Sequence, residues 1–527
     1  MSARIALSGR VGRWMAFLLV FACLIGRVAA ADKAEKRTSP PRLHVSMVVD
    51  FGQDVGQNFG SLFEIKNQQG VVIAGAGFLG AYNTEPRGNR RRLNFFLKPR
   101  FPEAAARTTP LPRVSGDSGV YLFEFNRRLY AMSRSGGKDL RLRYWDARSS
   151  RWRVEERPVR DAIDVADGVL TTSRQRIQYN DQIVLDVHRL PEQIGSHYYA
   201  RGHLIFRFVA RQKKPPVNRL VACPWSPDGP KLADLNEART IDLRSPGEFV
   251  YAFGQLGGVV LAATNTGGVY RFDGDRWEVM LEPDLKVSYQ VYAMLNYYDR
   301  LLLGQYPTGQ LFQFDRQRLR RLEGWPPVMP GVSPHARETQ TLAIYGGDLY
   351  AGVWPWAEVW RYRRDDDKWS FVRRMFSHPK PTDAVNHPYE TETKRVDKVY
   401  NLWGQRVTSM VPMGDSLYIA TSAKTSRPLE RKFDFLMGRQ NDYGLVYRYT
   451  LPNQWAAEVR WKAGPTKFDF ELSDGKMTVS QDGDPLGSVA LQLDAAEPIE
   501  PAQITWGDGV YGRCPAKIDQ RSMLPRP

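Results

Sequence analysis

The sequence predicts an all-β chain built from repeated units of four short strands, and three observations predict it. Tyr, Phe and Trp make up 12% of the residues, and glycine (44) and proline (35) are frequent. Long stretches with the 3.6-residue period of a helix are absent. Short apolar segments separated by turn residues recur at similar spacing, which is the pattern of a repeat architecture.

The repeated unit runs in a constant order: an apolar strand, a turn with Gly or Asp, a second and a third apolar strand, then a charged turn and a last strand that often begins with Trp. Clear copies lie at 249–281, 287–322, 340–375 and 407–461, and looser copies at 120–155 and 169–221. One such sheet cannot bury both of its faces, whereas radial packing buries neighbouring sheets on one another. The predicted fold is therefore a β-propeller with four-stranded antiparallel blades. Seven blades is the central expectation, and six or eight remain open.

The two ends of the chain supply the remaining blade in this prediction. Strand-like segments lie within 43–99, and 467–512 contains the hairpin pattern FDFELSDGKMTVSQDG. Pairing the two ends would hide edge strands that otherwise invite aggregation. The expected organisation is a signal peptide at 1–30, a propeller at 31–465, and a C-terminal β-hairpin segment at 466–527 that completes the ring with 43–99. A separate small β-domain at one or both ends is the alternative.

The repeat resembles the kelch-like and sialidase-like β-propeller superfamily in its order, with a third strand VYRF at 269–272 or VYRY at 446–449. The resemblance covers 120–461. Two family features are missing: the double glycine of kelch repeats is replaced by Ala-Gly-Val at 351–353, and the sialidase Asp-box has no clean copy. The resemblance therefore implies a fold and carries no function.

The N-terminus predicts export. Arg4, Arg10 and Arg13 precede the apolar run 14–26, and small residues at 28–30 suit cleavage after Ala30. The mature chain is then secreted or held in the periplasm or cell envelope, with no membrane span after cleavage. A short N-terminal anchor, and a lipoprotein attached at Cys23, are the alternatives.

The formal net charge is +17, with a pI near 9.7. The basic residues are spread along the chain as doublets, which suits an anionic polysaccharide, an anionic surface or simple solubility, and nucleic acid is not an expected partner. Cys223 and Cys514 remain after signal cleavage. In an oxidising compartment they predict one disulfide, and two buried free thiols are the alternative.

Long irregular segments point to a binding face. In an up-and-down blade, the loops between strands two and three and the links between blades lie on the same side. The segments 188–203, 224–239, 377–403 and 424–443 are assigned to that side. Aromatic and polar residues there suit a sugar or a protein partner. The predicted ligand-binding residues are Tyr306, Trp354, Trp356, His378, His387 and Glu390. Packing between blades is the alternative for the two tryptophans.

No nucleophile elbow, phosphate loop, dinucleotide fingerprint or metal-ligand spacing is present in the sequence, so no cofactor and no metal is expected. We expect a binding protein for a glycan or a protein partner. The alternative is a carbohydrate-active enzyme, a hydrolase or lyase that acts on an anionic polysaccharide. Its weak catalytic candidates are His188, His197, Tyr198, Arg201 and His203.

Overall fold

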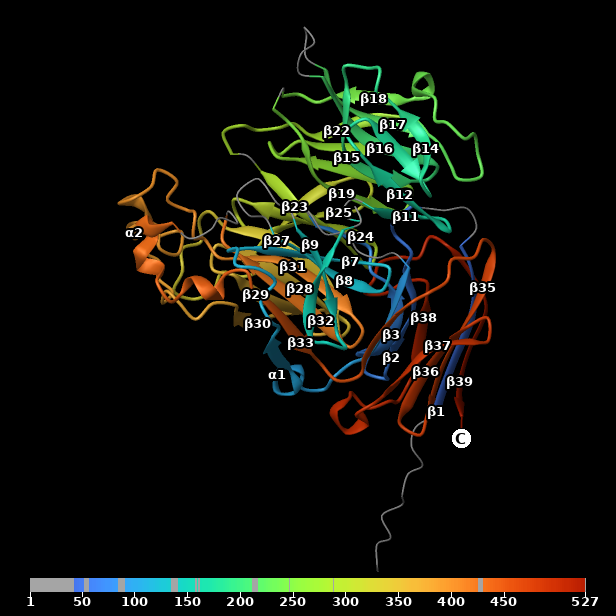
Figure 1. The fold of residues 1–527 in the computed structure, drawn as a ribbon. Coiled ribbons are helices and arrows are strands. Elements are labelled where there is room, and N and C mark those ends of the chain that lie inside the picture. The colour runs from blue at the N-terminus through green and yellow to red at the C-terminus, as the bar shows by residue number, and fades with distance from the viewer. Residues whose placement is uncertain are drawn as a thin grey trace, which may run out of the picture. The chain divides into compact units, whose positions relative to one another are not determined.

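The computed structural model describes residues 42–51, 56–83, 91–133, 141–156, 159, 162–210, 217–245, 247–287, 289–424 and 430–526. The predicted signal peptide, 1–30, lies outside these residues. Every strand pair among them is antiparallel, and Figure 1 shows that arrows far outnumber coiled ribbons. The all-β prediction is confirmed.

Seven consecutive sheets, numbered 1 to 7 here in chain order, hold the described strands between 107 and 450. Sheets 1 and 2 contain β7 (Val120–Phe125), β8 (Arg128–Ser133), β9 (Leu142–Asp146) and β10 (Arg151–Glu155), then β11 (Ile163–Val165), β12 (Gly168–Thr172), β13 (Arg176–Tyr179) and β14 (Gln182–Asp186). Sheets 3 and 4 contain β15 (Gln193–Ala200), β16 (His203–Ala210), β17 (Val217–Pro224) and β18 (Arg239–Asp242), then β19 (Val250–Leu256), β20 (Val259–Thr264), β21 (Val269–Phe272) and β22 (Trp277–Leu281).

Sheets 5 and 6 contain β23 (Gln290–Tyr297), β24 (Arg300–Tyr306), β25 (Leu311–Phe314) and β26 (Leu319–Leu322), then β27 (Glu338–Tyr345), β28 (Asp348–Trp354), β29 (Glu358–Arg363) and β30 (Lys368–Arg374). Sheet 5 has a fifth strand, β4 (Ala81–Asn83), beside β23. Sheet 7 contains β31 (Arg406–Met413), β32 (Ser416–Ser422), β33 (Val446–Thr450) and β6 (Arg107–Pro110).

The first strands of these sheets contact one another in sequence, from β11 through β15, β19, β23 and β27 to β31, and β31 in turn contacts β7. The remaining strands follow outward in chain order, except that the early strand β6 takes the outermost place in sheet 7. The arrangement is propeller-like, because each sheet buries its faces against the sheets before and after it. Apolar clusters that span neighbouring sheets form the core.

The chain ends combine into two further five-stranded sheets, which we call the terminal sheets. One contains β1 (Arg42–Asp50), β35 (Pro465–Ser473), β36 (Lys476–Gln481), β37 (Asp484–Ala490) and β39 (Lys517–Arg526). The other contains β2 (Gly60–Lys66), β3 (Val72–Phe78), β5 (Arg92–Leu97), β34 (Gln454–Glu458) and β38 (Gln503–Trp506). Figure 1 shows blue β1 beside red β35 and β39. One apolar cluster joins the two sheets, so residues 43–99 and 466–527 share a core.

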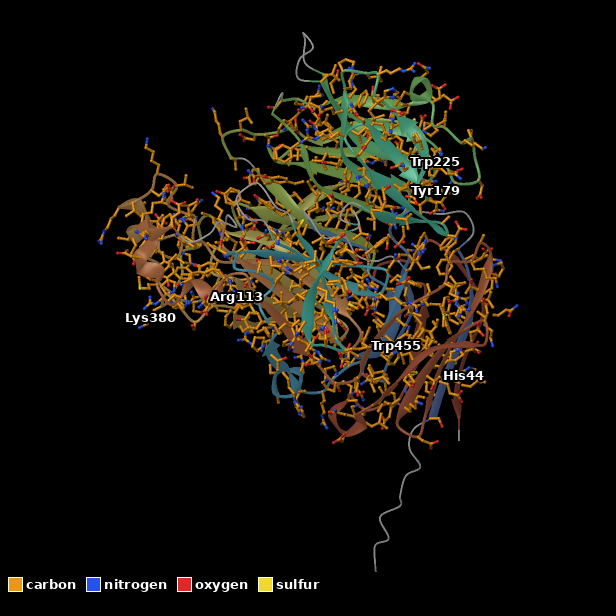
Figure 2. All side chains as sticks on the ribbon, in the orientation of Figure 1. His44, Arg113, Tyr179, Trp225, Lys380 and Trp455 are labelled. Atoms are coloured by element: carbon orange, nitrogen blue, oxygen red, sulfur yellow. The ribbon has the colours of Figure 1, made fainter. Side chains whose placement is uncertain are left out.

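The ends exchange strands with the repeat. The sequence placed Trp455 in the last strand of the unit 407–461, but β34, which holds Trp455, pairs with β5 in a terminal sheet (Figure 2). The vacant outer position in sheet 7 is filled by β6, which pairs with β33. An early strand thus completes the last repeat, and the edge of β33 is covered.

The unit predicted at 169–221 is two units, sheets 2 and 3. The segment QIGSHYYA at 193–200, which lies within the predicted loop 188–203, is strand β15. Its polar side chains are not in solvent as a loop would place them: His197 is buried, and the Ser196 hydroxyl donates to the Val250 carbonyl in the next sheet. The rings of Tyr179 in sheet 2 and Trp225 beside sheet 3 lie 5.4 Å apart (Figure 2).

Two of the four long segments lie where the sequence placed them. The link 375–405 joins β30 to β31, and the loop 423–445 joins β32 to β33. The other two assignments are wrong: 188–203 consists largely of β15, and 224–239 joins the third and fourth strands of sheet 3, which meet on the opposite side. We call the side that holds the links 323–337 and 375–405 and the loop 423–445 the loop face.

The terminal sheets contact the opposite side of sheets 5 and 6. The Tyr298 hydroxyl, in the turn after β23, donates to the Glu64 carboxylate in β2 at 2.9 Å. The Lys98 ammonium, which follows β5, lies 3.2 Å from the Asp348 carboxylate at the start of β28. The loop face of these sheets is therefore the side away from the terminal sheets.

The described helices are short. They are α1 (Pro102–Ala105), α2 (Glu390–Lys394) and the 3-10 turns η1 (Leu235–Glu237), η2 (Arg431–Leu436), η3 (Gln440–Asp442) and η4 (Leu493–Ala495). In the described part of the chain, no helix has the length and apolar character that a membrane crossing requires.

Candidate functional site

The loop face of sheets 5 to 7 repeats one local arrangement. Tyr306 ends β24 and Trp354 ends β28, and each is followed by proline. The carbonyl of Pro307 accepts a hydrogen bond from the Arg337 backbone N–H at 2.8 Å, and that of Pro355 accepts one from Gln405 at 2.7 Å. Each second strand is thereby tied to the residue just before the next sheet's first strand. The repeat places the two aromatic rings side by side, with centroids 6.3 Å apart.

The long link 375–405 extends this aromatic row. The His387 ring lies 4.8 Å from the Trp354 ring, and the half-exposed Tyr400 ring lies 6.0 Å from His387. Gly404 leaves room for Trp354, because a Cβ at that position would lie 2.4 Å from the indole Nε1. We call Tyr306, Trp354, His387 and Tyr400 the aromatic row. Sequence reasoning predicted the first three of these residues.

Glu390 orients His387 within the row. The His387 Nδ1 lies 2.9 Å from the Glu390 Oε2, which also accepts the backbone N–H of His387. Burial lowers the pKa of His387, so its ring is neutral at neutral pH. Although burial opposes it, hydrogen bonds from Lys394 and His387 lower the pKa of Glu390. The hydrogen bond between His387 and Glu390 connects the segment before α2 to the first residue of that helix.

His378 connects two segments of the loop face. Its Nδ1 lies 2.5 Å from the Tyr389 hydroxyl, and its Nε2 lies 2.8 Å from the Asp442 carboxylate. Tyr389 belongs to the link 375–405 and Asp442 to the loop 423–445, so this histidine holds the two segments of the loop face together. Its pKa is lowered, chiefly by burial.

Trp356 does not belong to the surface. It is 0% exposed and packs in an apolar cluster with Met329, Val332 and Trp360. The exposed sugar-stacking role predicted for it is wrong, because the loop 355–357 turns this ring inward beneath the link 323–337. The packing alternative is the observed one for both tryptophans, because Trp354 is also buried, at 2% exposed.

The weak catalytic candidates do not converge. His188 precedes β15 and Arg201 follows it, and an eight-residue strand separates its two ends by about 26 Å. His203 packs on Phe272, and its Nδ1 lies 3.0 Å from the Arg201 carbonyl. His197 and Tyr198 are buried within the strand itself. The catalytic arrangement imagined for these residues fails, because it depended on reading the strand as a loop.

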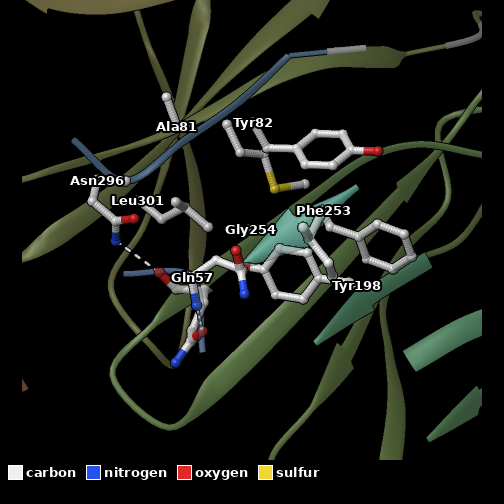
Figure 3. A pocket seen from close by; sticks show the side chains of 12 residues that line it. Gln57, Ala81, Tyr82, Tyr198, Phe253, Gly254, Asn296 and Leu301 are labelled. Carbon is white, nitrogen blue, oxygen red and sulfur yellow. Dashed lines mark hydrogen bonds between the residues drawn. The ribbon is translucent and has the colours of Figure 1, made fainter. Parts of the chain in front are cut away.

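Tyr198 instead lines a small cavity among sheets 3 to 5 (Figure 3). Its ring lies 5.4 Å from Phe253, and Tyr82 in β4 covers both. The Asn296 amide donates to the Gln255 carbonyl at 2.7 Å beside it, as the dashed line shows. The cavity measures about 20 Å³, which suits about one water molecule and not a sugar.

A polar cluster, which sequence reasoning missed, adjoins the aromatic row. The Arg406 guanidinium lies 3.4 Å from the Glu338 carboxylate and donates to the Lys424 carbonyl at 3.1 Å. The rings of Tyr251 and Tyr292 contact each other at a tilt, with centroids 4.9 Å apart. We call these residues, together with Tyr121, which hydrogen-bonds to Arg406, the inner-strand cluster. Arg406 connects it to the row, because its Cζ lies 5.8 Å from the Trp354 ring centroid.

β-Bulges shape this cluster. The pairing register shifts near the start of β15, β19, β23, β27 and β31, leaving one extra residue in each first strand. The extra residues are Ser196, Tyr251, Tyr292, Gln340 and Thr408. A bulge turns a side chain away from the regular alternation. It therefore brings polar side chains together where the first strands begin.

Electrostatics in the cluster favour charged Arg406 and neutral tyrosines. Burial, followed by the nearby Glu338 charge, raises the pKa of Tyr251 and of Tyr292, so both hydroxyls remain protonated. Burial raises the pKa of Glu338, against the opposing effect of Arg406 and Lys424. Burial and the Arg406 charge lower the pKa of Lys424. The cluster thus offers hydroxyl, guanidinium and ammonium donors around one carboxyl group.

The predicted disulfide is not formed. Cys223 and Cys514 are both free, buried thiols. Cys223 lies in β17 within the core of sheets 2 and 3, whereas Cys514 follows β38 of a terminal sheet. The two residues belong to different cores. Within the described ranges, no group of three or more His, Cys, Asp or Glu side chains is placed to hold a metal ion.

No protein-family model and no curated protein matches this sequence. Among solved structures, the computationally designed protein Ika8 matches with a TM-score of 0.35 and 10% identity, over 64% of this chain and 99% of that chain. BamB from Moraxella catarrhalis matches with a TM-score of 0.28 and 12% identity, over 62% and 87%. A mutant Trypanosoma rangeli sialidase displaying trans-sialidase activity matches with a TM-score of 0.21 and 9% identity, over 92% of this chain and 93% of that chain. These TM-scores are low, so the kelch-like assignment has no support and the site rests on this chain's own geometry.

Proposed function

We propose that this chain is an exported, non-catalytic binding protein that holds a saccharide on the loop face of sheets 5 to 7. In this proposal sheets 1 to 7 are the blades of a closed seven-bladed ring. The contact of β31 with β7, and the place of β6 at the edge of sheet 7, support closure. The signal-like N-terminus supports export to the periplasm, the envelope or the outside.

The observation that carries the proposal is the aromatic row beside the inner-strand cluster. Tyr306 is half-buried and Tyr400 is exposed, and aromatic rings at such positions suit contact with the apolar faces of sugar rings. The neighbouring cluster supplies hydrogen-bond donors and acceptors for hydroxyl groups. A mostly apolar platform with a few convergent polar groups is the usual form of a small-ligand site.

A glycan array, followed by titration calorimetry with the best ligand, tests the proposal. Tyr306→Ala should weaken binding about three- to tenfold, because one ring contact is lost. Phe101→Ala is the matched control: Phe101 is an aromatic residue 63% exposed beside α1, away from the loop face. Equal losses in both variants, or no binding to any glycan, would contradict the proposal.

The alternative is a hydrolase or lyase that acts on an anionic polysaccharide. The tyrosine hydroxyls beside Arg406 favour it, since a lyase needs a proton-transferring group next to a cation. Turnover of an acidic polysaccharide, lost in Tyr292→Phe, would establish this alternative. Binding without turnover on every substrate would support the binding protein.

A protein partner is the second ligand class for this face. Val399, Tyr400 and Met437 are exposed there, and Met437 is 78% exposed. Binding of a purified envelope protein that survives Tyr306→Ala but not Met437→Ser would favour a protein over a glycan.

A further inference from the structure

The inner-strand cluster holds polar atoms that the protein itself leaves unused. Glu338 is 2% exposed and its Oε1 has no hydrogen-bond partner. Gln340, the bulge residue two positions further along β27, is 3% exposed, and its Oε1 is also unpartnered. The Arg406 Nε, also buried, is unpartnered too. Buried polar groups are nearly always hydrogen-bonded, so these atoms require an explanation. A polar ligand that reaches the cluster would supply partners for both acceptors and donors.

The charge of the cluster is unbalanced. The cluster contains two basic side chains, Arg406 and Lys424, and one acidic side chain, Glu338, which interacts electrostatically with both. The Lys424 ammonium donates to Asn401 at 2.8 Å and has further protons to donate. With all three side chains ionised, their net charge is one positive charge in a partly buried place, where electrostatic attraction is stronger than in water. A ligand with a single negative charge matches this net charge.

Saccharide hydroxyls match the other unused atoms. Glu338 and Gln340 present acceptors, to which sugar hydroxyls can donate. The tyrosines around them are half-buried or buried and protonated, so they act as donors or acceptors as required. The cluster is contiguous with the aromatic row through the contact of Arg406 with Trp354. One chain of sugar rings can therefore occupy both.

We infer that the inner-strand cluster is a subsite for the carboxylate of an acidic sugar residue, held by Arg406 and Lys424, while the neighbouring ring lies on the aromatic row. This inference rests on the proposed saccharide binding and specifies its ligand class. Glu338 limits the site to one negative charge, because a second would face a carboxylate at the Arg406 side.

Calorimetry with matched oligosaccharides tests the inference. Polygalacturonate fragments, alginate fragments and hyaluronan fragments carry the carboxylate, and methyl-esterified polygalacturonate keeps the sugar but loses the charge. At least one acidic fragment should bind about tenfold or more tightly than an uncharged counterpart, since hydrogen bonds to charged groups are the stronger ones. Dextran sulfate distinguishes a carboxylate from anions in general, and its binding should be weaker.

Two variants, one that removes a positive charge and one that removes a negative charge, extend the test. Lys424→Gln should weaken the acidic fragment about tenfold and leave the esterified fragment unchanged. Glu338→Gln removes the opposing charge, so it should tighten the acidic fragment or relax selection against dextran sulfate. Lys432→Gln, an exposed lysine on the same face, is the matched control and should change neither. Thermal melts of each variant exclude a loss of fold.

The outcomes separate the two proposals. Equal affinity for acidic and esterified fragments, with Tyr306→Ala still weakening both, would overturn the carboxylate subsite and leave saccharide binding standing. Equal effects of Lys424→Gln and Lys432→Gln would also overturn the subsite. If no glycan binds, whether acidic or neutral, both proposals fail.

Discussion

Lys98 joins a terminal sheet to sheet 6, and its removal should be costly. Its ammonium lies between the Asp348 carboxylate, at 3.2 Å, and that of Asp365, with which it also forms a hydrogen bond. Lys98 is 5% exposed and Asp348 is 4% exposed. The Arg361 Nε lies 3.7 Å from Asp348 on its other side. Lys98 and Asp348 therefore form a buried ionic contact, and Arg361 is a second cation beside Asp348.

Lys98→Met removes the cation and keeps most of the apolar stem. Breaking a buried pair by removing one partner costs about 3–5 kcal/mol, because a charge is left without compensation. Arg361 still faces Asp348, so we expect the lower end, about 3 kcal/mol at pH 7. Burial already raises the pKa of Asp348, against the opposing effect of Lys98. Without Lys98 the pKa rises further, and the carboxyl group protonates as the pH falls.

The sign of the pH dependence follows from that shift. Above the raised pKa, folding holds an ionised carboxylate in a buried place, and the variant is destabilised. Below that pKa the Asp348 carboxyl group is neutral, and the difference in unfolding free energy between the wild type and the variant becomes smaller. Urea denaturation at pH 7 and at mildly acidic pH measures both. Lys368→Met, at an exposed position in β30, is the control, and adding Asp348→Asn should restore part of the loss. A deficit below about 1 kcal/mol, as for a surface pair, or one that grows on acidification would refute the reasoning.

Three further predictions follow from packing and burial. Trp356→Ala should lower the unfolding free energy by about 3–5 kcal/mol in a denaturant titration, yet leave saccharide affinity unchanged below the melting temperature, and an unchanged stability would contradict its core position. Gly304→Ala should cost about 1–3 kcal/mol, because its Cβ would lie 2.3 Å from the Thr339 carbonyl oxygen, and a melt at the wild-type temperature would argue against that contact. Cys223 and Cys514 should react with a thiol reagent only after denaturation, since burial raises the pKa of each to about 12, whereas a disulfide-linked peptide in non-reducing mapping would contradict free thiols.

The repeat could be recognised from sequence wherever strands are apolar and turns carry Gly or Asp. The unit predicted at 340–375 corresponds to β27–β30, which ends at Arg374. The prediction was wrong at β15, because Ser196 and His197 interrupt the alternation of apolar and polar residues in that strand. His197 is buried, and half-buried Ser196 donates to the Val250 carbonyl of the next sheet. A strand whose polar groups are satisfied by a neighbouring sheet resembles a loop when its sequence is considered alone.

The aromatic row and the inner-strand cluster differ in how far they could be foreseen. Tyr306 and Trp354 end strands in equivalent copies of the repeat, so alignment of those copies placed them on one face. Tyr251 and Tyr292 lie inside apolar strands, and the regular period of two predicts their direction incorrectly. The bulges that redirect them leave no sequence signal of the Gly or Pro kind. Proximity of Glu338 to Arg406 depends on packing between sheets 6 and 7, which a single strand does not encode.

The terminal sheets contact sheets 5 and 6 on the side opposite the loop face. The loops that form the aromatic row come from sheets 5, 6 and 7. Sheets 5 and 6 are anchored from the other side, sheet 5 through Tyr298 and Glu64 and sheet 6 through Lys98 and Asp348, and β6 completes the outer edge of sheet 7. A binding site requires side chains held in place by the structure beneath them. Buried ionic contacts are weak evidence for stability in themselves, but they fix one arrangement against alternatives. In this chain both ends contribute to that support, so a truncation of the last strands that leaves the loops intact should still loosen ligand binding.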